Sequence, residues 1–204
     1  MSYSVTVKDE ASPKLKRLDE FISSGKMDDT IGRAASNVIR AHFTRLQSER
    51  PNKEGWTRQN FWSKCNESTS HASQPGVSVI TIAKLGFRQR LEGGKIEAQN
   101  GKYLTIPATS EAYGKRAGQF SNLRFGFAEN KYGNLMPALL KAAATRSPKG
   151  KLQGKDAKKN IGNVMYWLTP RVFQRADPSV LPHEDVITTY ALAAADKEIR
   201  RITK

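Results

Sequence analysis

The sequence predicts an α+β fold, in which a small mixed or antiparallel sheet with a β-hairpin is packed by two principal helices and joined by long loops. Two observations predict it: apolar residues recur at helical spacing near both ends of the chain, and short β-branched segments lie between them. The length of 204 residues favours a single domain over residues 1–204. Leu, Ile, Val and Phe make up only 42 of these residues, which favours a modest core. We therefore expect that long polar segments become ordered only against partners.

The N-terminal residues are expected to form a strand and then a helix. Ser4–Lys8 alternates in polarity, which is typical of a short strand. Ser12 is expected to cap a helix whose first position is Pro13, and Gly25 is expected to close it. The apolar positions of this helix are Leu15, Leu18, Phe21 and Ile22.

The strongest helical pattern runs from about Asp28 to Glu49 and ends before Pro51. Its acidic start suits the positive end of a helix dipole. His42 lies within the apolar stripe, so we interpret it as a packed core histidine rather than a ligand. The stripe consists of Ile31, Ala34, Ala35, Val38, Ile39, His42 and Leu46.

Residues 50–76 are expected to form a loop that carries three aromatic residues, Trp56, Phe61 and Trp62. These side chains either cover the edge of a small core or anchor in a neighbouring subunit. The next segment, Val77–Ala83, is apolar on both faces, which predicts a central strand.

The middle of the chain predicts a β-hairpin. Residues 95–99 and 102–106 flank Asn100-Gly101, and this dipeptide suits a two-residue type I′ turn. Residues 122–127 and 164–168 read as further strands, and residues 134–140 between them are ambiguous.

A final helix is predicted from about Glu184 to Ile202, with an acidic start and a basic end that match the helix dipole. It has two apolar sides. Burial against the sheet explains one side, and contact with another chain explains the second. The first side is Leu192, Ala195, Ile199 and Ile202, and the second is Val186, Ile187, Tyr190 and Ala194. The candidate subunit-interface residues are Trp56, Phe61, Trp62, Leu192, Ile199 and Ile202.

The formal net charge is +15, and residues 121–160 alone carry +7. Glycine and proline break any helix at about 145–160, so we expect a mobile basic loop there. Two interpretations stay open: a solvated linker, or a loop that orders on phosphates or on an acidic neighbour. The residues that would make that contact are Arg146, Lys149, Lys151, Lys155, Lys158 and Lys159.

No arrangement of residues indicates catalysis, so we expect no enzyme, no metal and no cofactor. The histidines lack zinc spacing, and the single cysteine, Cys65, has no local signature of a nucleophile. A metal-dependent nuclease or other hydrolase would rest only on Glu92, Glu97 and Glu111, the acids near the hairpin. No apolar run reaches the length of a membrane helix, and the N-terminus lacks an export signal. These features favour a reducing cytoplasm, or export inside a larger particle.

A nucleic-acid-binding module is supported by charge and not by motif. The sequence has no helix-turn-helix, zinc-finger or RNA-platform signature. Tyr132, Tyr166 and Trp167 could stack on bases, and each also suits a core or an interface. The basic excess therefore supports non-specific phosphate contact at most.

Three stretches together resemble a family of neck and tail-completion (head–tail joining) proteins of long-tailed bacteriophages and prophages. The first is the helix Ile31–Leu46, which ends in HFTRL and is followed by RPNKEGWTRQNFW. The second is LEGGKIEAQNGKYLTIPATSEAYGK, Leu91 to Lys115, and the third is RADPSVLPHEDVI, Arg175 to Ile187. The resemblance spans most of residues 30–200 and leaves out the basic loop.

This resemblance implies a structural virion protein that forms a homo-oligomeric ring joining the capsid connector to the tail. It implies no catalytic residues, and its partners are further copies of the chain and the adjoining neck, connector and tail proteins. Head completion, tail completion and tail termination stay open. The expected location is the virion neck or the head-proximal tail, after assembly in the host cytoplasm, with non-specific contact to genomic DNA in the lumen.

Overall fold

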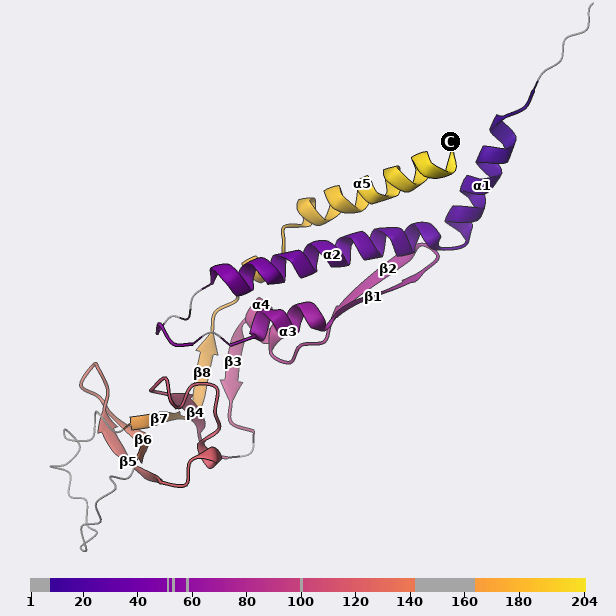
Figure 1. Ribbon diagram of the computed structural model, residues 1–204. Helices are drawn as coiled ribbons and strands as arrows, with labels where there is room; N and C mark the ends of the chain where they lie inside the picture. Colours follow the sequence, from indigo (N-terminus) through magenta and orange to yellow (C-terminus); the bar gives the residue numbers. More distant parts are fainter. Residues whose placement is uncertain (1–7, 51, 53, 58, 100, 142–163) are drawn as a thin grey trace, which may run out of the picture. The chain divides into compact units, whose positions relative to one another are not determined.

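The computed structural model describes residues 8–50, 52, 54–57, 59–99, 101–141 and 164–204 (Figure 1). The chain has an α+β fold with small antiparallel sheets, as the sequence predicts. Residues 1–50, 60–92 and 176–204 belong to one compact unit, and residues 51–59 and 93–175 belong to a second. The single domain over residues 1–204 stays a prediction. The predicted strand at residues 4–8 and the basic loop at 145–160, with its six candidate contact residues, lie outside the described residues, apart from Lys8.

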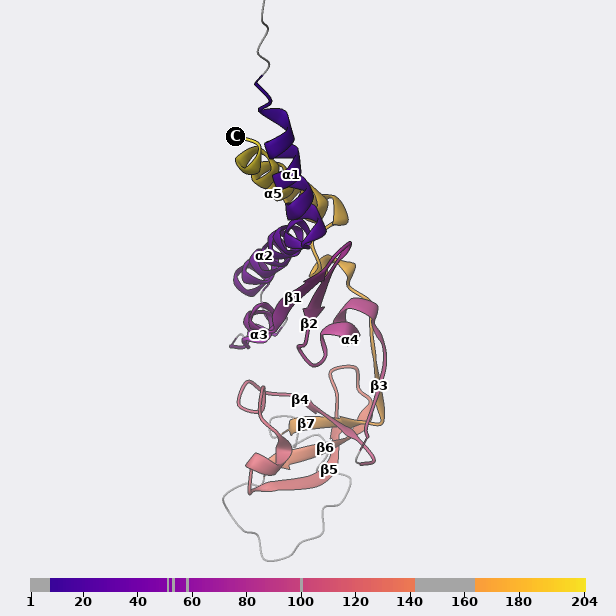
Figure 2. The same cartoon turned by 90° about the vertical axis from the view of Figure 1, so that its right-hand side faces the viewer.

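The first unit holds the long helices and a two-stranded ribbon. Helix α2 lies between α5 on one side and the ribbon on the other, so the unit has three layers (Figures 1 and 2). Its elements are α1 (Ala11–Ser23), α2 (Lys26–Glu49), α3 (Phe61–Glu67), β1 (Thr69–Gln74), β2 (Val77–Ile82), α4 (Phe87–Glu92), the 3-10 turn η4 (Pro178–Val180) and α5 (Glu184–Ile202).

Helix α1 is confirmed, but Ser12 is not its cap. The carboxylate Oδ1 of Asp9 accepts hydrogen bonds from the backbone N–H groups of Ala11 and Ser12, at 3.1 and 3.0 Å. Asp9 therefore satisfies two of the unpaired donors at this helix start. The pKa of Asp9 is held below its usual value by these hydrogen bonds from Ser12 and Ala11.

Helix α2 is confirmed and forms the centre of the first unit. It ends where Arg50 adopts an extended backbone ahead of Pro51. Its buried side chains recur at helical spacing, and Phe43 is fully buried among them. The ring of Phe43 stacks on Trp62 with centroids 6.1 Å apart and meets the edge of Phe87 at 5.5 Å. These aromatic contacts form the core of the first unit.

The prediction of a loop over residues 50–76 is wrong for its second half, which forms α3 and β1. Helix α3 has only 7 residues, so its intrinsic helical pattern is too short to stand out in the sequence. Burial of Trp62 and Cys65 against α2 stabilises it. Tertiary packing thus decides the structure of this segment.

Strand β2 is confirmed as a strand, but it is not central. It pairs antiparallel with β1 alone, from Thr69 opposite Ile82 to Gln74 opposite Val77. Its inner face packs on α2, while Val77 and Val79 on its outer face are 49% and 54% exposed. The apolar pattern on both faces therefore does not reflect burial on both faces.

The second unit is built on a four-stranded antiparallel sheet with strand order β4-β7-β6-β5. The strands predicted at residues 122–127 and 164–168 are confirmed, and the ambiguous residues 134–140 form a strand. Strands β3 and β8 form a separate antiparallel pair. The elements are β3 (Gly94–Glu97), β4 (Leu104–Pro107), the 3-10 turn η1 (Ala117–Gln119), β5 (Leu123–Glu129), β6 (Leu135–Lys141), β7 (Val164–Thr169) and β8 (Arg171–Gln174).

The predicted hairpin around Asn100-Gly101 is wrong. Strand β3 pairs with β8, where Ile96 lies opposite Val172, and β4 pairs with β7, where Ile106 lies opposite Trp167. An isolated two-stranded hairpin is only marginally stable in water. Pairing with β7, whose side chains are mostly buried, instead makes β4 part of the four-stranded sheet.

Helix α5 spans the residues that the sequence predicts, and its apolar face packs on α2 rather than on a sheet. The buried residues are Ala191 and Ala195, whose small side chains allow the two helices to approach closely. At the helix start, the Asp185 backbone N–H donates to Nδ1 of His183 at 3.4 Å. This contact assigns a capping role to His183.

Candidate interaction groove

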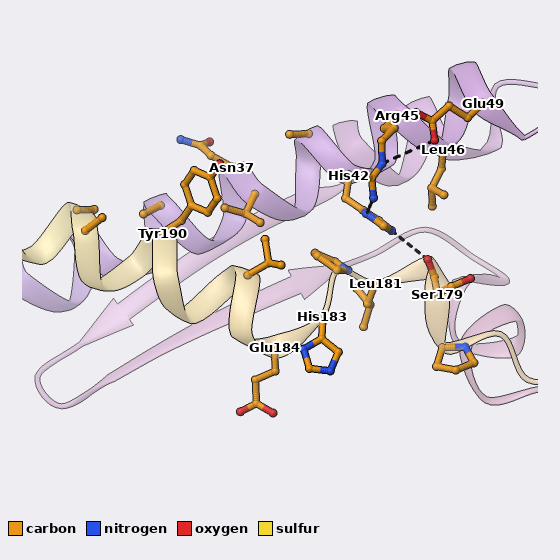
Figure 3. A pocket seen from close by; sticks show the side chains of 18 of the residues that line it. Asn37, His42, Arg45, Leu46, Glu49, Ser179, Leu181, His183, Glu184 and Tyr190 are labelled. Atoms are coloured by element: carbon orange, nitrogen blue, oxygen red, sulfur yellow. Dashed lines mark hydrogen bonds and ion pairs between the residues drawn. The ribbon is translucent and has the colours of Figure 1, made fainter.

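A groove of about 1540 Å³ runs along the two helices α2 and α5 of the first unit (Figure 3). One wall is the exposed flank of α2, and the other is the segment that leads into α5 together with the first turns of that helix. Most of the lining is apolar. The apolar lining residues are Ala34, Val38, Ala41 and Leu46 from α2, and Pro178, Leu181, Pro182, Val186, Tyr190, Ala193 and Ala194 from the other wall.

His42 is a buried residue near the middle of the α2 stretch that lines the groove (Figure 3). Its Nε2 lies 3.0 Å from the carbonyl oxygen of Ser179, and its Nδ1 lies 3.0 Å from Nη2 of Arg45. Because a guanidinium can only donate, Nδ1 accepts and Nε2–H donates to the carbonyl. The ring is therefore neutral, and burial lowers the pKa of His42 despite the carbonyl contact. The prediction of a packed histidine is confirmed.

A second set of polar contacts fixes the segment between the sheet-forming unit and α5. Nη1 of Arg50 donates to Asp177 Oδ2 at 2.6 Å, and Nη2 donates to Ser179 Oγ at 2.5 Å. The Ser179 hydroxyl in turn donates to Asp177 Oδ1 at 2.5 Å. These hydrogen bonds, first that from Ser179 and then that from Arg50, hold the pKa of Asp177 below its ordinary value. This clamp, formed by Arg50, Asp177 and Ser179, connects the end of α2 to η4, which forms one end of the groove.

The rim of the groove carries both signs of charge. Arg45 and Glu49 lie 3.8 Å apart across one turn of α2, and Glu184 and Lys197 lie on the other wall. The aromatic side chain of Tyr190 projects from α5 beside Asn37 of α2 and is 60% exposed (Figure 3). An apolar lining with a charged rim is common at surfaces that bind other proteins.

The structure distributes the predicted interface residues over several environments. Trp62 is buried in the core of its own unit, which is the first of the two alternatives for the loop aromatics. Phe61 is half-buried, with the guanidinium of Arg90 4.3 Å from its ring centroid. Trp56 is half-buried in the second unit, 5.2 Å from the ring of Tyr113. On α5, Leu192 is 63% exposed, and Ile199 and Ile202 are half-buried.

The residues considered for catalysis have structural partners. Cys65 is fully buried, and this burial raises the pKa of its thiol to about 11, so it stays protonated. Glu92, Glu97 and Glu111 each pair with a different cation: Arg88 at 2.8 Å, Lys95 at 2.6 Å and Lys141 at 2.9 Å. In the part of the chain that the structure describes, no three His, Cys, Asp or Glu side chains gather as metal ligands.

The aromatic residues considered for base stacking also differ. Tyr166 is buried, and its hydroxyl donates to the carbonyl oxygens of Ala112 and Lys115 at 3.2 and 2.9 Å. It therefore has a core role. Trp167 is half-buried against the sheet, and Tyr132 is exposed on the turn between β5 and β6.

Sequence reasoning did not predict the groove as a site, although it singled out some of its residues. Three of the four residues on the second apolar side of the C-terminal helix, Val186, Tyr190 and Ala194, line the groove, and the fourth, Ile187, packs on the core of the first unit. The candidate interface residues on this helix, Leu192, Ile199 and Ile202, are not among the lining residues. The sequence does not distinguish the opposite wall of the groove, because Ala34 and Val38 belong to the same apolar stripe of α2 as the buried residues. Only the position of α5 decides which part of that stripe stays open.

Neither a family model, nor a curated protein, nor a solved structure matches this chain. Within residues 8–141 and 164–204, and leaving aside the gaps in that range, no helix combines the length and the apolar character needed to cross a membrane.

Proposed function

We propose that this chain is a structural protein of the bacteriophage head–tail junction, a neck or tail-completion protein that forms a homo-oligomeric ring between the capsid connector and the tail. The observation that carries the proposal is the amount of large apolar surface that the chain leaves open. Leu85 is 90% exposed, Phe173 is 78% exposed and the groove beside α5 is apolar on both walls. Surface of this kind is typical of subunits that neighbouring chains cover.

The motifs that carry the family resemblance support the proposal through the roles of their residues. His42, in HFTRL, and Ser179, in RADPSVLPHEDVI, contact each other at the end of the groove. Trp62, the last residue of RPNKEGWTRQNFW, packs on Phe43. These residues hold the elements of the first unit together. Such a packing role is what we expect of motif residues in a structural protein.

The proposal is tested in the phage or prophage that encodes the chain. Deletion of the gene is expected to give filled heads and free tails that do not join, and an antibody to the chain is expected to label the neck in electron micrographs. Labelling at the head vertex, at the neck or at the end of an isolated tail would separate head completion, tail completion and tail termination. Normal infectious particles without the chain would contradict the proposal.

A non-specific nucleic-acid-binding module is the second candidate, and the net charge of +15 favours it. It predicts DNA binding whose affinity falls steeply as salt rises. The expected contact residues lie in the basic segment, so replacing them together with glutamine should weaken binding. They are Arg146, Lys149, Lys151, Lys155, Lys158 and Lys159.

A further inference from the structure

The ribbon formed by β1 and β2 has one edge along β2 that is open and one along β1 that is open beyond Thr69, whose carbonyl oxygen accepts a hydrogen bond from Arg40 Nη2 at 2.5 Å. Within the described part of the chain, each of these strands pairs only with the other. The six residue pairs run from Thr69–Ile82 to Gln74–Val77 without a bulge. An open and regular strand edge presents unpaired N–H and C=O groups, which makes it a template for pairing with another strand.

The ribbon lacks the features that normally prevent such pairing. Residues 68–83 contain no Lys, Arg, Asp or Glu, although charged residues make up 26% of the chain. Its one proline, Pro75, lies in the turn and not in either strand. Its outer face is formed by the uncharged side chains of Ser70, Ala72, Gln74, Val77, Val79 and Thr81, with Ala72 opposite Val79 near the middle. Soluble proteins usually protect an edge strand with lysine, proline or a bulge.

The ribbon is held firmly against α2, so its edges are ordered before any partner arrives. The backbone N–H of Gly76 donates to Asp28 Oδ2 at 3.0 Å, and His71 Nε2 lies 3.0 Å from Asp29 Oδ1. On the inner face, the hydroxyls of Ser73 and Ser78 lie 2.8 Å apart beside Gly32. A preorganised edge loses little conformational entropy when a strand is added.

The charge of the chain indicates which kind of partner can add a strand to the ribbon. Two copies of a chain with net charge +15 repel each other wherever their basic surfaces meet. The uncharged ribbon is a surface that two copies can bring together without that repulsion. A strongly acidic partner would gain little from this surface, because residues 68–83 carry no cation and Arg40, which reaches the ribbon from α2, already donates to the carbonyl oxygen of Thr69.

We infer that the β1–β2 ribbon is the contact between subunits, where the β2 edge of one copy pairs with the β1 edge of the next. This inference rests on the proposed function, because it assigns the contact that holds the ring together. The two edges differ, so the pairing is head-to-tail, and head-to-tail contacts generate rings when the rotation closes. Because the Thr69 carbonyl is already bonded to Arg40, the contact is expected along residues 70–74 of β1, a length of about 16 Å.

The test compares two lysine substitutions at exposed apolar positions of the first unit. Val79→Lys places a charge in the middle of the ribbon, and Leu15→Lys places the same charge on α1, where the side chain is 64% exposed. Both variants should fold, which circular dichroism and thermal unfolding would verify. Sedimentation velocity of the full chain should show an oligomer for the unmodified chain and for Leu15→Lys, and a weakening of at least tenfold for Val79→Lys. Ala72→Lys, on the facing strand, should behave like Val79→Lys.

Salt gives an independent readout. Because the contact is uncharged and the rest of the chain is basic, self-association should strengthen as salt screens the repulsion. Backbone amides of β1 and β2 should also exchange more slowly in the oligomer than in the Val79→Lys monomer. An unmodified chain that is monomeric at all concentrations, or a Val79→Lys oligomer equal to the unmodified one, would overturn the inference.

The outcomes separate this inference from the proposed function. If Val79→Lys still assembles and the chain is found in the neck, the ribbon is not the contact and the proposed function stands. If the chain is absent from particles while Val79→Lys abolishes its self-association, the ribbon contact stands and the proposed function fails.

Discussion

The contacts of individual side chains show which of them have a structural role, and His42 is the clearest case. Its apolar position in the sequence indicates burial, but only the structure identifies its partners, Ser179 and Arg45. Both nitrogens are occupied in the neutral form. A ligand or a general base needs a nitrogen that faces a substrate, so the geometry assigns His42 to holding the groove together.

The environment of His42 predicts how stability depends on pH. Its pKa in the folded chain is below the ordinary 6.5, so the folded state binds fewer protons than the unfolded state as pH falls through 6.5. The free energy of unfolding should therefore be constant above this value and fall below it, by less than about 1.4 kcal/mol for each pH unit. Urea unfolding at several pH values between 7.5 and 5.5 measures this slope. His42→Gln should flatten it, and an equal slope in that variant would show that another group is responsible.

Gly32 gives a prediction in which two effects oppose each other. Alanine would favour helix α2 by about 1 kcal/mol relative to glycine. However, a Cβ at this position would lie 3.0 Å from Ser78 Cβ and 3.1 Å from Ser73 Oγ. Overpacking of this kind costs about 1–3 kcal/mol, so Gly32→Ala should be net destabilising. Asn37→Ala, at an exposed position of the same helix, serves as the control and should be neutral or mildly stabilising in thermal unfolding.

At the scale of elements, the sequence predicts those whose stability is local. Helices α2 and α5 have long apolar stripes, acidic starts and clear ends, and both form where expected. The elements it misses depend on distant partners. Helix α3 exists because Trp62 packs on Phe43, and β3 and β4 pair with β8 and β7 rather than with each other. A turn signal such as Asn-Gly carries no information about which distant strand gains most by pairing.

The clamp between α2 and η4 should contribute to stability as a connection between elements. Asp177→Asn keeps the shape of the side chain and removes the charge that Arg50 contacts at 2.6 Å. Because both side chains are about one-third exposed, the expected loss is about 1 kcal/mol rather than the larger value of a buried pair. Since the pKa of Asp177 is lowered, this contribution is present above pH 3.8 and is lost as pH falls below it. Chemical unfolding at pH 7 and at pH 3 would measure it, and an equal loss at both values would contradict the argument.

For the whole molecule, the proposed function rests on exposed apolar surface rather than on the buried core. The aromatic core of the first unit and the small sheet of the second leave large apolar side chains exposed in both units. Sequence composition indicates a modest core, and it gives no position for the surface that partners cover. That surface depends on how α5 lies on α2 and on which strand edges stay open. Interface residues could therefore be predicted only as candidates.

Two residues of α5 distinguish the groove from the rest of the helix surface. Tyr190 lines the groove and Leu192 does not, and their side chains are 60% and 63% exposed. If a neighbouring neck or tail protein occupies the groove, Tyr190→Lys should reduce incorporation of the chain into particles at least tenfold, and Leu192→Lys should leave it unchanged. Quantitative immunoblotting of purified particles, after complementation of a deletion with each variant, gives the ratio. The opposite result would place the contact on the Leu192 face, and equal incorporation of both variants would exclude both faces of α5 from the particle contact.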